Sequence, residues 1–239
     1  MIKNFFKILT FILVILFLFL GYFSYFGITT SKFNSIIKDK IKNYNENLDI
    51  QLSKVKLHLN LKNISIKIKT KNPKIILSNS DSLELNEISS NISIFSYFQN
   101  KFAIKNVSIE SKNNKLGTYI DFYKLNNKNT LQIILVKQAL KGGTAKFNAD
   151  LYFDDFGRIK NNYIITGKVL NAELLIPQKV KELNFNFTIK KNSYKFEKIL
   201  FEFNKIKFNS EIFNIKQNNK NFYVNGNLLS KKNKLNKDL

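Results

Sequence analysis

The sequence predicts a mainly β fold, in which an N-terminal transmembrane helix is followed by an antiparallel β-sheet with two or three short helices. Two observations predict it. A long apolar segment near the N-terminus carries no charge. After it come successive short stretches in which apolar and polar residues alternate, as they do in strands with one buried face. Because the turns between these stretches are short, we expect an antiparallel meander.

Residues 1–28 are predicted to be a transmembrane signal anchor. No charged residue occurs between Lys7 and Lys32, and the stretch from Ile8 to Phe26 forms about 28 Å of helix, which matches a bilayer's hydrocarbon core. The segment is longer than a signal-peptide core and no small-residue cleavage site follows it, which favours an uncleaved anchor over a cleaved signal. The predicted membrane residues are Ile8, Leu13, Leu16 and Leu20, with Tyr22 and Tyr25 in an interfacial aromatic belt.

Positive charge before the helix predicts its orientation. Lys3 and Lys7 precede the span, so the positive-inside tendency places the short N-terminal tail in the cytoplasm. The rest of the chain is then exported. Lysines also follow the span, from Lys32 onward.

Residues 29–128 are predicted to hold an amphipathic helix and a first β module. The helix has its apolar residues on one face, and Thr30 or Ser31 is expected to cap it. It either lies on the membrane or covers one end of the sheet. The face consists of Phe33, Ile36, Ile37, Ile41 and Tyr44.

The first β module begins with "KVKLHLNLKNISIKIKT", residues 54–70, which alternates almost without a break. The phase slips once, at Asn63. Pro73 fits the start or edge of the next strand, and "FSYFQNKF" predicts a short helical turn. The apolar side of the two alternating runs consists of Val55, Leu57, Leu59 and Leu61, then Ile64, Ile66 and Ile68.

Residues 129–230 are predicted to hold a helix and a second β module, followed by a polar tail at 231–239. The helix is expected to start at a Thr130 cap and to stop at Gly142–Gly143. Residues Asp154–Gly157 form a turn between strands. The apolar side of the later strands includes Phe147, Leu151, Phe153, Phe185, Phe187, Phe201 and Phe203.

The charge pattern does not favour nucleic-acid binding, and we expect no nucleic-acid partner. The net charge is +22, but Arg158 is the only arginine, and arginine is the side chain suited to bidentate phosphate and base contacts. The lysines are also spread along the strands. A weak attraction to anionic lipid headgroups is compatible with this pattern.

Side chains for catalysis or metal binding are scarce. The chain has no cysteine, and its one histidine, His58, lies on the polar side of a predicted strand without carboxylates near it in the sequence. The "DFG" at 155–157 is explained by a turn, and "KGGT" at 141–144 lacks the spacing of a phosphate loop. We therefore expect no enzymatic activity, no catalytic residue, no cofactor and no metal site.

A sheet with one apolar face leaves three possibilities. Only two or three short helices are available to cover this face. Left uncovered, its apolar area would exceed the few hundred square ångströms that soluble monomers normally expose. It must curl on itself, pack on another sheet, or hold something apolar.

The order of these segments resembles the amino-terminal region of the AsmA-like family, bacterial relatives of the bridge-like lipid-transfer proteins. The resemblance lies in "LDIQLSKVKLHLNLKNISIKIKTKNPKIIL", in "LELNEISSNISIFSYFQNKFAIKNVSIES" and, more loosely, in "KGGTAKFNADLYFDDFGRIKNNYIITGKVLNAEL". It covers most of the chain, although it rests on patterns and not on signature residues. Family members are usually several times longer.

The resemblance implies a single-pass inner-membrane protein with most of its chain in the periplasm. Its sheet would be an elongated, curved groove whose apolar lining holds lipid acyl chains, for phospholipid transport or outer-membrane maintenance. Membrane phospholipids would be its ligands, and another envelope protein would complete the bridge. The lining would be the fourteen apolar strand residues given above. The alternative is a membrane-anchored closed β-sandwich or jelly roll that serves as a scaffold subunit of an envelope export or secretion assembly.

Overall fold

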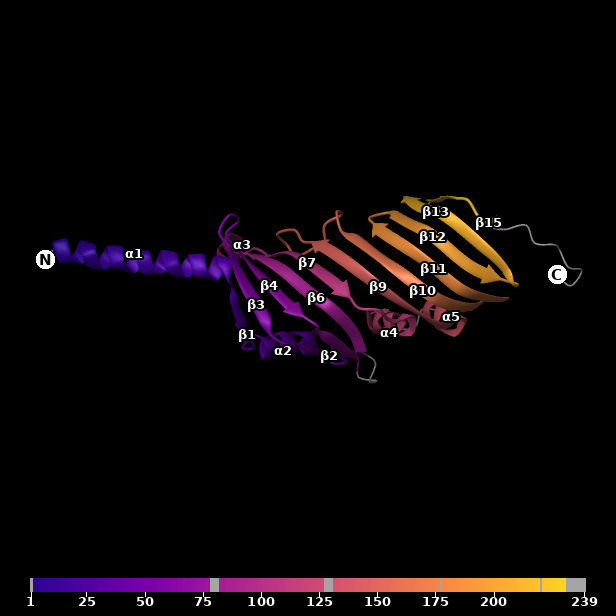
Figure 1. Cartoon of the computed structure of the whole chain (residues 1–239), viewed down its shortest axis with the longest axis horizontal. Helices are drawn as coiled ribbons and strands as arrows, with labels where there is room; N and C mark the ends of the chain where they lie inside the picture. The colour runs from indigo at the N-terminus through magenta and orange to yellow at the C-terminus, as the bar shows by residue number, and fades with distance from the viewer. Residues whose placement is uncertain (1, 78–81, 127–130, 177, 220, 231–239) are drawn as a thin grey trace, which may run out of the picture.

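The chain forms one open antiparallel sheet with an isolated helix at its N-terminal end (Figure 1). The computed structural model describes residues 2–77, 82–126, 131–176, 178–219 and 221–230. Its 15-stranded sheet runs in the order β1-β3-β4-β6-β7-β9-β10-β11-β12-β13-β14, with β2, β5, β8 and β15 attached beside this path. The predicted mainly β meander is therefore confirmed, whereas a closed sandwich or jelly roll is not what the chain forms.

Helix α1 (Ile2–Tyr25) projects away from the sheet, as Figure 1 shows. Residues Asn4–Tyr25 are long and apolar enough to cross a membrane, and none of this stretch is buried against the rest of the chain. Strand β1 (Ile28–Thr30) follows at once and pairs with β3, with Ile28 opposite Leu57. The helix is thus joined directly to the first edge of the sheet.

Helix α2 (Asn34–Tyr44) packs against strand β2 (Leu48–Gln51), so it covers the sheet at the end next to α1. The predicted caps at Thr30 and Ser31 are wrong, because the residue before the helix is Phe33, which makes no side-chain cap. Asn34 instead ties the helix to the chain after β2. Its Nδ2 donates to the carbonyl oxygens of Leu52 and Ser53 at 3.2 and 2.7 Å.

The first half of the sheet consists of the strands that the alternation predicted, together with a short helix. They are β3 (Val55–Asn60), β4 (Ser65–Lys71), β5 (Lys74–Leu77), β6 (Ser82–Ser93), α3 (Ile94–Phe98), β7 (Ile104–Ser111) and β8 (Asn114–Lys115). Strand β6 pairs with both β4 and β5, and β5 pairs with β2. The sheet therefore branches at β6, with β4 and β3 on one branch and β5 and β2 on the other.

Two helices then lie along one edge of the sheet, α4 (Leu116–Asn126) and α5 (Leu131–Ala139). Helix α4 was not predicted. The predicted stop of α5 at Gly142–Gly143 is wrong, because strand β9 (Leu140–Tyr152) begins directly after Ala139 and contains both glycines. The expected Thr130 cap, the boundary at 128/129 and the tail at 231–239 lie outside the described residues.

The second half of the sheet is a run of long hairpins. Its strands are β10 (Ile164–Ile176), β11 (Gln178–Lys190), β12 (Ser193–Phe203), β13 (Ile206–Asn218), β14 (Asn221–Gly226) and β15 (Leu229–Ser230). Strand β7 pairs with β9, so the sheet continues from the first half into the second without a break.

In the part of the chain that the structure describes, the buried apolar side chains all precede residue 173. In the described residues they are Ile50, Val55, Leu59, Leu77, Leu83, Leu85, Ala139, Ala145, Ala149, Val169 and Ala172. From residue 173 onward the only buried residue with described burial is Ser210. The buried apolar side chains therefore lie on the elements up to β10, and none is described on β11–β15.

Candidate functional site

The candidate site is a row of half-buried apolar side chains on one face of β10–β13, which we call the trough. Cross-strand register places its members side by side: Phe187 is opposite Phe196, which is opposite Phe213. Phe201 is likewise opposite Phe208. The trough consists of Ile165, Phe185, Phe187, Ile189, Tyr194, Phe196, Ile199, Phe201, Phe203, Ile206, Phe208, Phe213 and Ile215.

Aromatic contacts between neighbouring strands order this row. The Phe201 and Phe208 rings stack with centroids 5.2 Å apart and planes 15° from parallel. The Phe185 ring meets that of Phe196 edge-on, with centroids 5.6 Å apart. Such pairs add about 0.5–1.5 kcal/mol beyond area burial, so the rings hold one another on an otherwise uncovered surface.

Three left-handed residues keep the apolar side continuous along the strands. Asn171, Glu182 and Lys198 have φ of 50°, 51° and 52°, and the β10–β11 and β11–β12 registers shift close to them. A bulge changes which side the following residues face. Leu200 is 53% exposed as a result, whereas Ile199 and Phe201 are half-buried.

Helix α4 covers only the β9 side of the trough. The Tyr119 ring contacts that of Phe147 with centroids 5.8 Å apart, and the Tyr119 hydroxyl donates to the carbonyl oxygen of Ala145 at 3.0 Å. The small core of Ala145, Val169 and Ala172 lies beneath it, with Leu116, Leu183, Phe185 and Phe187 packed around that core. Apolar side chains farther along, on β12 and β13, have no helix over them in the described part of the chain.

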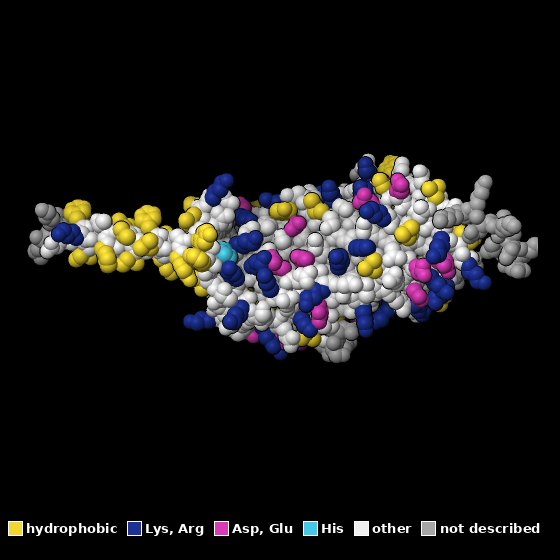
Figure 2. All heavy atoms as spheres, in the orientation of Figure 1, with side chains coloured by type: hydrophobic (Ala, Val, Ile, Leu, Met, Phe, Trp, Pro, Cys, Tyr) yellow, Lys and Arg dark blue, Asp and Glu magenta, His cyan; other side chains and the backbone are white. Residues whose placement is uncertain are grey.

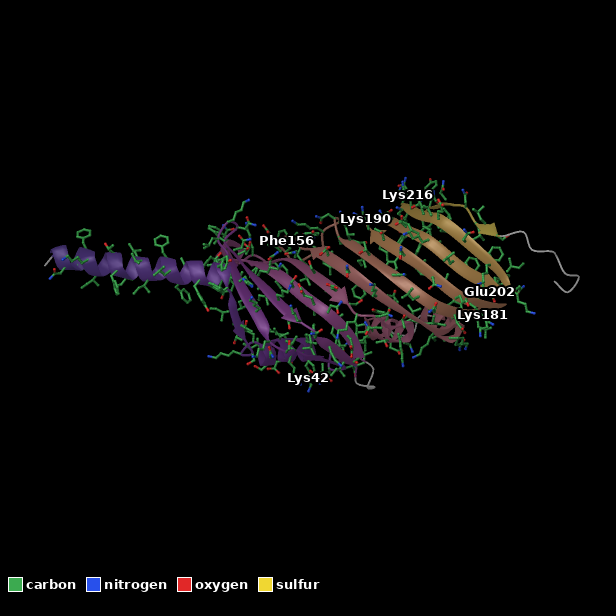
Figure 3. All side chains as sticks on the ribbon, in the orientation of Figure 1. Lys42, Phe156, Lys181, Lys190, Glu202 and Lys216 are labelled. Carbon is green, nitrogen blue, oxygen red and sulfur yellow. The ribbon has the colours of Figure 1, made fainter. Side chains whose placement is uncertain are left out.

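The other face and the ends of the strands are polar. Figure 2 shows lysines and carboxylates scattered over the sheet between α1 and the C-terminal strands, with few apolar side chains among them. At the strand ends, Lys190 and Lys216 lie on one rim of the sheet and Lys181 and Glu202 on the opposite rim (Figure 3). The trough is therefore bordered on both sides by charged groups.

The predicted lining residues fall into three groups. Phe185, Phe187, Phe201 and Phe203 lie in the trough. Phe147 and Leu151 lie half-buried on β9, and the Phe153 ring, just past β9, contacts that of Phe102 at 5.6 Å. Val55 and Leu59 are buried, and Leu57, Ile66 and Ile68 are half-buried on the same side of β3 and β4.

Two of the predicted residues need correction. Leu61 and Ile64 do not belong to the strands, because β3 ends at Asn60 and β4 begins at Ser65. Both lie exposed in the turn between the two strands, where Ile64 has a φ of 44°. The apparent alternation of residues 54–70 thus runs through a turn.

Several trough residues were missed by the prediction, among them Tyr194, Phe196, Phe208 and Phe213. Phe196 and Phe201 are an odd number of positions apart, so a strict alternation cannot place both on one side. The bulge at Lys198 accounts for this. The high phenylalanine content of these strands indicated an apolar surface, but it did not predict the position of the bulge.

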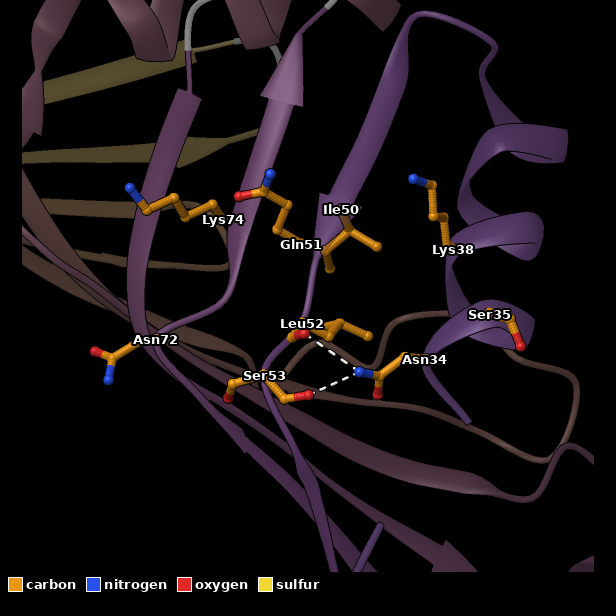
Figure 4. Close-up of a pocket in the computed structure, with 9 residues that line it drawn as sticks. All are labelled: Asn34, Ser35, Lys38, Ile50, Gln51, Leu52, Ser53, Asn72 and Lys74. Atoms are coloured by element: carbon orange, nitrogen blue, oxygen red, sulfur yellow. Dashed lines mark hydrogen bonds between the residues drawn. The ribbon is translucent and has the colours of Figure 1, made fainter. Parts of the chain in front are cut away.

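A polar pocket of about 490 Å³ lies between α2 and the β2–β5 branch (Figure 4). Both of its lysines are already paired: Lys38 lies 3.0 Å from Asp49 and Lys74 lies 2.7 Å from Glu84. These pairs lower the pKa of the Asp49 and Glu84 carboxyls, chiefly through the hydrogen bonds from the lysines. The pocket therefore offers little unbalanced charge.

His58 lies at the junction of α1 and the sheet. A Cβ atom on Gly27 would be 2.9 Å from the His58 ring. Partial burial lowers the imidazole pKa, and Lys56 and Lys67 lower it further.

Asp154–Gly157 forms the predicted turn, in which Gly157 donates to the Asp154 carbonyl oxygen at 3.1 Å. Among the described residues, no three His, Asp or Glu side chains gather as a possible metal site.

Comparison of the chain with protein-family models, with curated proteins and with solved structures gives no match in any of the three.

Proposed function

We propose that the protein is anchored in the bacterial inner membrane by α1 and binds lipid acyl chains in the trough, on the periplasmic side. This would serve phospholipid transport or outer-membrane maintenance, as the resemblance to AsmA-like proteins implies. One observation carries the proposal: the second half of the sheet presents rows of phenylalanines that none of the described elements encloses.

Physical chemistry supports hydrocarbon as the ligand. Each methylene group removed from water contributes about 0.8 kcal/mol, so an acyl chain lying along the trough needs no specific pocket. The lysines on the rims, such as Lys190 and Lys216, are suited to meet phosphate groups that remain in water. Binding would also cover the apolar face that the fold leaves open.

Among the described residues, β14 pairs with β13 alone, and its outer edge supports a partner at the far end. β14 is the last strand of the sheet order and lies at the opposite end from α1 (Figure 1). An unpaired strand edge is a ready template for another strand. We propose that another envelope protein meets the trough there and continues the path for lipid.

The test is native mass spectrometry of the full chain extracted in mild detergent. We expect phospholipid-sized mass additions on the wild type. Phe201→Lys places a charge in the trough and should remove them. Leu200→Lys is the matched control, because Leu200 is the preceding residue of the same strand and faces away from the trough.

A second pair protects the test against misfolding of one variant. Phe213→Lys should remove the bound lipid and Ile212→Lys should retain it, since Ile212 is exposed. Circular dichroism confirms that each variant is folded. A folded wild type without lipid, or equal lipid on both members of each pair, would refute lipid binding in the trough.

A further inference from the structure

A cluster of exposed apolar and aromatic side chains lies away from the trough, where the β3–β4 turn meets α3. We call it the proximal patch. The backbone N–H of Ile94 donates to the carbonyl oxygen of Ile64 at 3.2 Å, which joins the two segments. Its members are Leu61, Ile64, Phe95, Tyr97 and Phe98, which are 52%, 43%, 58%, 70% and 78% exposed.

Helix α3 is held so that its aromatic side chains stay outward. The Ser93 hydroxyl caps the helix by accepting from the backbone N–H of Ser96 at 3.2 Å, and Ser96 is buried. Ile94 is half-buried, and the three other side chains of the helix, Phe95, Tyr97 and Phe98, are exposed. The Tyr97 and Phe98 rings meet edge-on at 5.9 Å.

The register of β1 and β3 places the patch beside the exit of α1. β3 is antiparallel to β1 and Ile28 is opposite Leu57, so the residues after Leu57 run back toward the end of α1. The His58 ring lies against Gly27 accordingly. In Figure 1, α3 and the β3–β4 turn lie at the α1 end of the sheet, and Figure 2 shows apolar atoms gathered at this junction.

The patch lies at the same end of the sheet as the exposed apolar surface of α1. Tyr22 and Tyr25 in the last turn of α1, and Phe26 just after it, are exposed, and aromatic rings of this kind favour the headgroup level of a bilayer. Lys62 is exposed in the turn between Leu61 and Ile64. A lysine at that depth attracts anionic headgroups.

We propose that the proximal patch inserts into the interface of the bilayer that α1 spans. The membrane would then hold the sheet at two points, the helix and the patch. This fixes the orientation of the sheet and keeps its first strands at the lipid surface. The partner is a phospholipid surface with anionic headgroups. The inference rests on α1 crossing a membrane and is independent of lipid binding in the trough.

The chain contains no tryptophan, so a single introduced indole reports its own surroundings. We would make Phe98→Trp in the full chain and reconstitute it in vesicles of phosphatidylethanolamine and phosphatidylglycerol with brominated acyl chains. The indole emission should be quenched and shifted to shorter wavelength. Tyr223→Trp on β14, exposed at the opposite end of the sheet, is the matched control and should show neither effect.

Two further variants separate this inference from the proposed function. Phe213→Trp reports brominated lipid in the trough, whereas Tyr97→Trp repeats the patch measurement if Phe98→Trp does not fold. Quenching at position 213 without quenching at position 97 or 98 would refute the insertion of the proximal patch and would still support lipid binding in the trough. Equal quenching at positions 98 and 223 would also refute it, because the whole sheet would then lie on the membrane.

The charge of the turn gives an independent readout. In the Phe98→Trp background, Lys62→Glu should weaken the quenching of the introduced indole in vesicles that contain phosphatidylglycerol and leave it unchanged in vesicles of zwitterionic lipid alone. An identical response in both vesicle types would contradict the assignment of anionic headgroups.

Discussion

Gly167 of β10 lies directly opposite Phe187 of β11, and the Phe187 ring occupies the space that a side chain at position 167 would need. On its other side Gly167 is opposite Phe147 of β9. The glycine thus makes room for aromatic rings at the border between the helix-covered part of the sheet and the trough.

Gly167→Ala should destabilise the fold. A Cβ atom there would collide with the Phe187 ring and would lie 2.5 Å from the carbonyl oxygen of Lys146. Overpacking of this kind costs about 1–3 kcal/mol, which lowers Tm by about 2–12 °C in a chain of this size. Thermal unfolding in detergent measures it. Gly142→Ala is the control, since nothing lies within 4 Å of a Cβ atom at that position; equal Tm values for the two variants would contradict the steric explanation.

Asn114→Ala should weaken the contact between β6, β8 and α4. The Asn114 Oδ1 accepts from the Glu84 N–H at 2.8 Å, and its Nδ2 donates to the Glu84 carbonyl oxygen at 2.9 Å and to the Tyr119 hydroxyl at 3.2 Å. Leaving such buried groups without partners costs about 1–3 kcal/mol each. Urea denaturation should show a lower midpoint than for Asn113→Ala, which changes an exposed neighbour. Coinciding midpoints would show that these hydrogen bonds contribute nothing.

His58 should titrate below the ordinary histidine pKa of about 6.5. Partial burial and the charges of Lys56 and Lys67 lower its pKa in the folded chain, so the unfolded chain binds more protons below pH 6.5. Its contribution to stability is therefore complete above pH 6.5 and is lost as the pH falls from there through the folded pKa. Because the chain has one histidine, a single imidazole NMR signal reports the titration. Lys67→Gln should raise the pKa, and a wild-type value at or above 6.5 would overturn the prediction.

Val224→Lys should reduce self-association. β14 carries no charged residue, and Phe222 and Val224 are exposed on this edge strand. Lysine on an edge opposes pairing with a second strand. Light scattering over a range of concentrations in detergent is the measurement. Asn209→Lys adds the same charge to β13, so equal effects from both variants would assign the change to net charge and not to the edge.

Much of the architecture follows from local pattern. The charge-free run after Lys7 predicted α1, and the alternation from Val55 to Ile68 predicted β3 and β4. Helix α4 was missed because "LGTYIDFYKLN" contains a glycine and aromatic and β-branched residues but no clear helical period. The glycine pair was mistaken for a helix stop, although Gly143 adopts a φ of 108° inside β9, where a Cβ atom would strike the backbone of Ala172.

The openness of the trough was beyond the sequence alone. Phe185 and Val55 both follow an alternating pattern, yet Val55 is 1% exposed and Phe185 is only half-buried. Alternation shows which residues share a side of the strand, but it does not show whether another element covers that side. The bulges at Asn171, Glu182 and Lys198 add a second obstacle, because each reverses the alternation within a strand.

The order of the strands also bears on how the molecule forms and how its size changes in evolution. From β9 to β14 each strand pairs with the next one along the chain, so every newly synthesised strand finds its neighbour already in place and closes only a short turn. A hairpin gained or lost between β10 and β13 would change the reach of the protein and leave the core around Val55 and Leu85 untouched. Length is thus a property that this design can vary one hairpin at a time.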